Sequence, residues 1–229
     1  MDDLQGRLVQ IGLDVLAEYG FVLAGGYALQ AHQLVERMSE DVDLFTDRWD
    51  SDGFDRAVET VAEAYRRDGL EVIVVRRAET FARLQVVDPR AARAGTVDLA
   101  ADCRDREPVR VSFGPVLAEL DAVASKVATV FSRGEARDYL DLAGILDSGR
   151  FTREELITLA ANVDSGFSKG WFADALAGVD RFPDEEFSAY GVDAERITRV
   201  RESMRDWCQQ LRREVSLEDP SREGPGIGF

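Results

Sequence analysis

Histidine is almost absent from this chain, and cysteine is scarce. His32 is the only histidine among 229 residues, and the two cysteines, Cys103 and Cys208, are far apart in the sequence. A single histidine leaves little room for a zinc centre or a histidine-based triad. The cysteines are not spaced as metal ligands, so we interpret them as reduced thiols of a cytoplasmic protein.

Long apolar segments are also missing. The sequence contains no run of about twenty apolar residues, so no membrane span is expected. Its first residues lack a basic region followed by an apolar segment, which argues against a secretory leader. The predicted environment of the protein is therefore the cytoplasm.

Basic residues are too few to balance the acidic ones. The chain carries 28 Lys and Arg against 44 Asp and Glu, which gives a formal net charge of −16. This balance argues against broad, salt-driven binding along a nucleic acid, because phosphate contacts need clustered cations. Arginines do gather in the middle of the chain, either as a local basic cleft or as solvated charges: Arg76, Arg77, Arg90, Arg93, Arg104, Arg106 and Arg110.

The pattern of apolar residues changes halfway along the chain. Helical spacing and short apolar or alternating runs are mixed up to about residue 112, and helical patterns follow. The first half is expected to contain helices at residues 3–18, 28–36 and 50–68, and strands at residues 21–24, 41–45, 70–75, 81–87 and 96–100. We therefore predict an α/β (α+β) core over residues 1–112, a helical domain over residues 113–216 and a flexible tail over residues 217–229. Trp171 and Trp207 are interpreted as core residues of the helical domain.

Three aspartates on predicted strands carry the first chemical signal. Asp41 and Asp43 stand two residues apart on one strand, so their side chains point to the same face. Asp98 lies in the middle of a later strand and would join them if the two strands are neighbours. Carboxylates held together in this way favour Mg²⁺ or Mn²⁺, and such a trio can hold two cations that assist phosphoryl transfer.

A glycine pair carries the second signal. Gly25 and Gly26 follow a short apolar strand and precede a helix. Glycines at such a turn let a phosphate approach the backbone, where the N–H groups at the helix start are unpaired. A Gly-Gly turn alone is most often structural, but here it precedes a strand with Asp-x-Asp, in the order that a phosphate and metal site needs.

At this point the sequence resembles a known family. The stretches Leu23-Ala24-Gly25-Gly26-Tyr27-Ala28-Leu29 and Arg37-Met38-Ser39-Glu40-Asp41-Val42-Asp43-Leu44-Phe45 are similar to the glycine motif and the R-x-S-x-D-[IV]-D-L-F motif of the AbiEii nucleotidyltransferases. Lys126 and the segment Arg137-Asp138-Tyr139-Leu140-Asp141-Leu142 are similar to the third and fourth motifs of that family. The family includes toxins of type IV toxin–antitoxin pairs and the MenT enzymes, and the matches span more than half of the chain.

The resemblance implies a fold, a cofactor and a set of residues. The fold would be a polymerase-β-like nucleotidyltransferase core with a mixed sheet flanked by helices, and the substrate a nucleoside triphosphate. Mg²⁺ or Mn²⁺ would be held by Asp41, Asp43 and Asp98, with Asp98 as an alternative base for the attacking hydroxyl. The implied catalytic residues are Asp41, Asp43, Asp98, Lys126 and Asp141. The implied nucleotide-binding residues are Gly25, Gly26, Tyr27, Arg37, Ser39, Lys126 and Arg137.

Two points of the resemblance stay open at this stage. Family members commonly carry Thr or Ser after the glycine pair, whereas this chain has Tyr27, whose hydroxyl substitutes only if it turns back toward the site. Asp141 lies one helical turn from Asp138 and Arg137, so the fourth motif is either catalytic or a structural network.

The expected reaction is transfer of a nucleoside monophosphate to an acceptor hydroxyl with release of pyrophosphate. The family implies the 3′ end of tRNA as acceptor and a cognate antitoxin as partner, with no role for a membrane. An antibiotic-type enzyme with a small-molecule acceptor is one alternative, and the acidic composition favours it slightly. A non-catalytic relative that binds a nucleotide or an antitoxin is a second alternative, and a metal-dependent phosphohydrolase is a third.

Overall fold

The computed structural model describes residues 3–37 and 39–218. By its internal contacts the chain divides into two compact units, residues 1–123 and 124–229. The sequence patterns predict this division after residue 112. Within the described residues, no helix is both long enough and apolar enough to cross a bilayer. Cys103 and Cys208 are not joined to each other.

The first unit is built on a mixed seven-stranded sheet in the order β3-β4-β5-β2-β1-β7-β6. Its strands are β1 (Val22–Leu23), β2 (Asp41–Thr46), β3 (Glu71–Ala78), β4 (Phe81–Asp88), β5 (Arg93–Ala101), β6 (Val109–Val111) and β7 (Gly114–Val116). Strand β2 runs parallel to β5 and antiparallel to β1, while β3, β4 and β5 form an antiparallel meander. The chain therefore brings two strands that are far apart in the sequence, β2 and β5, together at the middle of the sheet.

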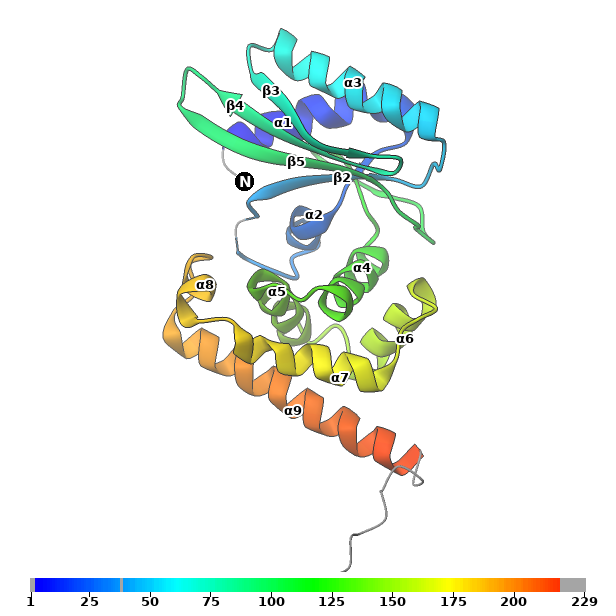
Figure 1. Cartoon of the computed structure of the whole chain (residues 1–229), viewed down its shortest axis with the longest axis vertical. Coiled ribbons are helices and arrows are strands. Elements are labelled where there is room, and N and C mark those ends of the chain that lie inside the picture. The colour runs from blue at the N-terminus through cyan, green and yellow to red at the C-terminus, as the bar shows by residue number, and fades with distance from the viewer. Residues whose placement is uncertain (1–2, 38, 219–229) are drawn as a thin grey trace, which may run out of the picture. The chain divides into compact units, whose positions relative to one another are not determined.

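Helices cover the two faces of this sheet unequally (Figure 1). Helices α1 (Asp3–Val15) and α3 (Ser51–Arg67) lie side by side on one face. The short helix α2 (Gly25–Ala31) lies on the other face beside β2. Leu44 points toward α1, because a Cβ atom at Gly12 would come within 2.7 Å of its Cδ1. Alternation along β2 then places its two aspartates on the face that carries α2.

Most predicted elements of this unit are present, and one helix is displaced. The sequence analysis expected a helix over residues 28–36, but α2 begins at Gly25 and ends at Ala31. It begins earlier because Ala24, which has an extended backbone, is the N-cap residue, so Gly25 and Gly26 form part of the first helical turn. It ends earlier because Gln33 has a positive φ of 59°, far from the value of about −63° that continues an α-helix. The short 3-10 helix η1 (Ala17–Tyr19) and the β6–β7 hairpin were not predicted.

The second unit is helical, as expected. Helix α4 (Glu119–Ser132) crosses the division, and the others are α5 (Ala136–Asp147), α6 (Arg153–Val163), α7 (Lys169–Ala177), η2 (Gly178–Arg181), α8 (Asp184–Ser188) and α9 (Ala194–Glu218). Helices α7 and α9 run side by side along much of their length (Figure 1). Their contact is aromatic, with the ring of Phe172 set edge-on to that of Trp207 at 5.2 Å between centroids.

The two tryptophans that were interpreted as core residues differ. Trp207 is fully buried, which confirms the interpretation for that residue. Trp171 is 70% exposed, so the interpretation was wrong there. Helix α7 turns Phe172 into the core, and its preceding neighbour consequently points outward. Of the predicted tail, Leu217 and Glu218 belong to α9, and the remainder lies outside the described residues.

Candidate functional site

The predicted carboxylates of the first unit meet on one face of the sheet. Asp41 and Asp43 are both partly exposed on β2, while Val42 between them is buried. Asp98 on β5 is the direct register partner of Asp43 across the parallel β2–β5 pair. The strand neighbourhood that the sequence could only assume is thus present, and Asp43 and Asp98 stand side by side.

Asp98 has a partner that the sequence analysis missed. Arg83, its register partner on β4, donates from Nε to Oδ1 at 2.7 Å and from Nη2 to Oδ2 at 2.6 Å. The pair is bidentate, and the Asp98 side chain is only 9% exposed. A fork of this kind is the strongest geometry for an arginine–carboxylate pair. Any cation or proton at Asp98 therefore competes with the guanidinium of Arg83.

The residues present fit a divalent cation held mainly by Asp41 and Asp43. In the part of the chain that the structure describes, no three His, Cys, Asp or Glu side chains are grouped as a metal site. Two carboxylates are nevertheless the usual protein share of a Mg²⁺ site, because substrate phosphates and water supply the other oxygens. The backbone around Asp43 is shaped for this, since a Cβ atom at Gly25 would lie only 1.8 Å from Asp43 Oδ2. The role of all three carboxylates as metal ligands stays a prediction.

The glycine motif and the R-x-S segment also meet. A Cβ atom at Gly26 would lie 2.9 Å from Ser39 Oγ and 3.5 Å from an Arg37 Nη2 atom. Ser39 is buried, and its hydroxyl donates to the carbonyl of Asp41 at 3.1 Å. A hydroxyl, a guanidinium and bare glycine backbone therefore adjoin the carboxylates. This combination suits the phosphates of a nucleotide.

The Tyr27 side chain is buried and points to the segment that contains Ser39. Its side chain is 2% exposed, and its hydroxyl donates to the carbonyl of Ser39 at 2.9 Å. Gln5 donates to the same carbonyl at 2.9 Å. Tyr27 thus fixes the segment that presents Ser39. A direct contact between Tyr27 and a phosphate stays a prediction.

The remaining predicted residues lie in the second unit around Lys126. Its ammonium contacts Asp138 Oδ1 at 2.8 Å and Asp141 Oδ2 at 2.9 Å, and both carboxylates are fully buried. Asp138 also accepts from the backbone N–H of Glu135 and so caps the start of α5. The third and fourth motifs are therefore joined in one buried ion network, which includes Arg133 at 3.4 Å from Asp138.

Electrostatics within this network favour the charged forms. Burial by itself would lower the pKa of the Lys126 ammonium, but Asp141 and Asp138 outweigh burial and raise that pKa. Burial would likewise raise the pKa of Asp138, but Lys126 and the Glu135 N–H hold it below its usual range. Arg137, also expected to bind the nucleotide, pairs with Glu135 at 2.9 Å.

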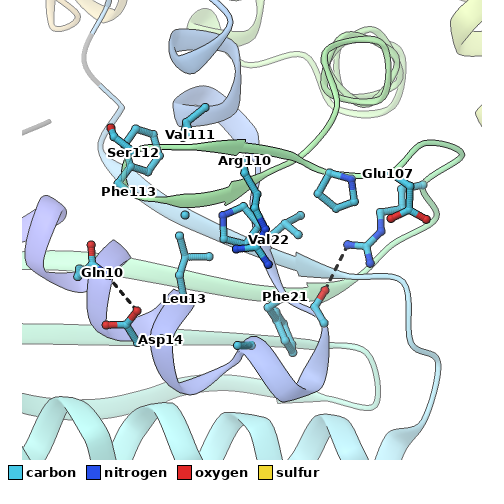
Figure 2. A pocket seen from close by; sticks show the side chains of 16 residues that line it. Gln10, Leu13, Asp14, Phe21, Val22, Glu107, Arg110, Val111, Ser112 and Phe113 are labelled. Atoms are coloured by element: carbon cyan, nitrogen blue, oxygen red, sulfur yellow. Dashed lines mark hydrogen bonds between the residues drawn. The ribbon is translucent and has the colours of Figure 1, made fainter.

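The first unit also contains a hollow that is lined by two of the arginines grouped in the middle of the sequence, Arg104 and Arg110. It has a volume of about 550 Å³ and lies between α1, β1 and the β6–β7 hairpin (Figure 2). Leu13, Phe21 and Phe113 line it together with Arg104 and Arg110. None of its lining residues is a predicted site residue, so this hollow is separate from the carboxylates.

Comparisons with known proteins agree with this geometry. A structure from Helicobacter pylori, described provisionally as a nucleotidyltransferase, superposes with a TM-score of 0.56 at 15% identity over 96% of this chain and 99% of that one. The nucleotidyltransferase toxin MenT4 of Mycobacterium tuberculosis superposes with a TM-score of 0.56 at 19% identity over 96% of this chain and 89% of that one. At these identities the structures show the fold. A search of curated proteins found no significant match.

A protein-family comparison identifies the family, which structures at such low sequence identity cannot do. The model of the family described as "Nucleotidyl transferase AbiEii toxin, Type IV TA system" matches residues 8–224, which include both units and all of the predicted motifs. The carboxylate pair, the glycine turn and the Lys126 network of this chain all lie within the matched residues. The chain belongs to the AbiEii nucleotidyltransferase toxin family of type IV toxin–antitoxin systems.

Proposed function

We propose that this protein transfers a nucleoside monophosphate from a nucleoside triphosphate to a hydroxyl of an RNA acceptor, with the 3′ end of tRNA as the leading candidate. The observation that carries the proposal is the position of Asp43. Its carboxylate lies against the bare backbone of Gly25 and beside Asp41 and Asp98. A metal ligand and a phosphate-binding turn in direct contact are what attack at a phosphorus atom requires.

In the proposed reaction the acceptor oxygen forms a bond to the α-phosphorus as the bond to the β-phosphate oxygen breaks. Pyrophosphate leaves with the electron pair, and the hydroxyl proton passes to a carboxylate. Asp41 and Asp43 would hold Mg²⁺ or Mn²⁺, which when bound neutralises charge on the reacting phosphates. Arg37, Ser39 and the backbone of Gly26 would orient the triphosphate.

Asp98 has two proposed roles, and both have the same structural requirement. It accepts the proton from the acceptor hydroxyl, or it completes the metal ligands. Either role requires that Arg83 give up at least one of the carboxylate oxygens that it now occupies. A substrate phosphate could draw the Arg83 guanidinium away from Asp98, because arginine binds phosphate and carboxylate in the same forked geometry.

The second unit is proposed to contribute through Lys126. Lys126 is one of only two lysines in the chain, and both of its carboxylate partners are buried. Its ammonium is therefore held in one position, as a residue that neutralises nucleotide phosphate would need to be. Asp141 and Asp138 are proposed to position it, and Arg137 to add a nucleotide contact. We further propose that the protein binds a cognate antitoxin and is located in the cytoplasm.

A small-molecule acceptor is the second candidate, and the net charge of −16 favours it because a polyanionic acceptor would be repelled at long range. A non-catalytic relative is the third, since the Tyr27 hydroxyl is engaged with the Ser39 carbonyl. One experiment separates all three. Each of the four α-labelled nucleoside triphosphates is incubated with total tRNA and cell extract, with Mg²⁺ or Mn²⁺.

Asp43→Ala is the matched inactive variant for this experiment. Label in tRNA with the wild type and not with Asp43→Ala would support the proposal and identify the nucleotide. Label only in a small molecule would keep the chemistry and reject the RNA acceptor. Absence of label from folded wild-type protein in every fraction would reject the transferase and favour the non-catalytic relative.

A further inference from the structure

Trp171 is an exposed aromatic residue for which the proposed chemistry has no use. It lies in the first turn of α7, and 70% of it is exposed, whereas the adjacent Phe172 is completely buried. Burial of an indole of this size would stabilise the fold by about 2–3 kcal/mol, which this position forgoes. A single exposed aromatic residue needs no functional explanation by itself, but one beside a concave surface with polar groups suits ligand binding.

Such a concave surface is present next to Trp171, entirely within the second unit. A hollow of about 480 Å³ is formed by the end of α4, Tyr139 of α5, one side of α7 and the η2 turn. Arg133 and Arg181 supply guanidinium groups to its lining, and both residues are exposed. Its volume is within the range that holds one small ligand in most proteins.

The charge of this lining is positive even though the chain as a whole is acidic. Its single carboxylate, Asp174, is paired at 2.8 Å with Arg212, which lies outside the lining. Arg133 stands 3.4 Å from the buried Asp138, whose other oxygen binds Lys126. Arg181 donates to the carbonyl of Gly178 at 3.3 Å, interacts with the Tyr139 hydroxyl and lies over the ring of Phe182, and all three of these partners are neutral.

We propose that this hollow binds one unpaired nucleotide of a single-stranded RNA acceptor. Trp171 would stack on the base, and Arg181 with Arg133 would contact the phosphate. An exposed indole beside guanidinium groups is the combination by which proteins bind single strands with little sequence preference. A peptide ligand is less suited for two reasons. The lining comes from helices and offers no sheet edge to which a peptide strand could bind, and its one carboxylate, Asp174, is already paired with Arg212. The inference rests on the proposed function, which supplies RNA as the acceptor.

The test measures binding without turnover. Asp43→Ala protein, without triphosphate or metal, is titrated into a fluorescein-labelled, short single-stranded oligoadenylate, and anisotropy is recorded. In this background Trp171→Ala is expected to weaken binding by about 5- to 150-fold, the range that the loss of one stacked base produces. Trp171→Phe should keep most of the affinity, since it retains an aromatic face.

Trp49→Ala is the matched control, because Trp49 is 60% exposed and belongs to the first unit. It is expected to bind the oligonucleotide like its parent, and circular dichroism checks that each variant is folded. Arg181→Gln should weaken binding and flatten its salt dependence. Equal binding by the parent and Trp171→Ala would overturn the inference and leave the surface to a protein partner. If Trp171→Ala weakened binding of ATP as much as binding of the oligonucleotide, the inference would also be overturned, because the hollow would then be a mononucleotide site.

These outcomes are separable from those of the labelling experiment. If label enters RNA but Trp171→Ala binds normally, the proposed function stands and this site falls. If Trp171→Ala abolishes RNA binding but no label is transferred, the nucleic-acid site stands and the transferase is rejected. A preference for the single strand over a duplex of the same sequence is also required, because a paired base cannot stack on Trp171.

Discussion

Gly25 is the residue at which the backbone and the chemistry are most tightly coupled. Its φ of +57° is one that side chains rarely adopt, and a Cβ atom there would collide with the Asp43 carboxylate at 1.8 Å. Two separate constraints therefore exclude a side chain at Gly25. The first is the left-handed backbone conformation of the turn, and the second is the space that the Asp43 carboxylate occupies.

Gly25→Ala is expected to abolish nucleotidyl transfer while costing about 1–2 kcal/mol of stability, since φ strain is modest but Asp43 must move. Gly149→Ala is the matched control, because Gly149 has a φ of +66° and no neighbour within 4 Å of a new Cβ. It should lose a similar amount of stability and no activity. Transfer rates and urea unfolding of both variants check this. Activity retained by Gly25→Ala would show that the position of Asp43 is not critical.

Arg83 controls access to Asp98, and its removal should be visible in metal binding. Arg83→Gln is expected to tighten Mn²⁺ binding severalfold, because the competing guanidinium is gone and Asp98 becomes available. The free Mn²⁺ signal in electron paramagnetic resonance measures this directly, without substrate. The increase should vanish in the double variant Arg83→Gln/Asp98→Asn. Weaker Mn²⁺ binding by Arg83→Gln would instead indicate that the pair only supports the local structure.

The difference between these residues explains what the sequence could reveal about the site. Asp41, Asp43 and the glycine pair were identifiable because their spacing within one segment already fixes which way they point. Arg83 was not, because its role depends on the register between β4 and β5, and a shift of one residue would turn it to the other face. Trp171 was misread because a helical spacing does not say which of two adjacent aromatics, Trp171 or Phe172, faces the core.

At the scale of elements, α4 and α5 are joined by the buried contacts of Lys126. Lys126→Met is expected to destabilise the protein by about 3–5 kcal/mol, because two buried carboxylates lose their cation. The other lysine, Lys169, pairs with Glu214 at 3.4 Å and is about one-third exposed, so Lys169→Met should cost less than about 1 kcal/mol. Chemical denaturation of both variants gives the comparison. Equal stability of Lys126→Met and wild type would leave Lys126 with a catalytic role alone.

The same network predicts an acid limit to stability. Asp138 has a pKa below its usual value of 3.8, so its contribution is present above that pH and is lost as pH falls through the lower value. Lys126 has a raised pKa, so its contribution persists below 10.5 and is lost only in stronger base. Melting temperatures should therefore be level from about pH 6 to 9 for this pair and fall below about pH 4. Asp138→Asn, already less stable at neutral pH, should show a shallower acid decline.

Sequence patterns predicted the long elements better than the short ones, because periodicity can be recognised only in a long segment. Helices α1 and α3 have long amphipathic repeats, and both were expected near their observed bounds. Helix α2 has only seven residues, so its limits depend on turn geometry at Gly25 and Gln33 more than on periodicity. The three-residue strands β6 and β7 are too short to show alternation, and they exist because β7 pairs with β1.

At the scale of the whole molecule, fold class was predictable because the order of motifs matched one family, and the family model covers residues 8–224. The net charge of −16 then limits how the proposed RNA acceptor could be held. Few phosphates can be contacted against a repulsive field, so recognition must concentrate in small sites. A broad basic surface is not needed for a reaction at one terminal hydroxyl.

RNA binding is therefore expected to depend weakly on salt. Each contacted phosphate of a single strand contributes a slope of about −0.7 to the plot of log affinity against log salt. One or two contacts give a total slope of about −1, which anisotropy titrations over a range of NaCl concentrations would measure. A slope steeper than about −3 would require an extended set of phosphate contacts and would contradict this view of the molecule.

Asp138 has a consequence for the order in which the second unit assembles. The same carboxylate caps the first turn of α5 and neutralises the ammonium of α4. Neither helix can reach its buried state alone, because α5 would bury the Asp138 and Asp141 carboxylates without a cation and α4 would bury the Lys126 ammonium without an anion. Docking of the two helices should therefore be a single cooperative step. Amide hydrogens of both helices are expected to exchange together, with one shared opening free energy.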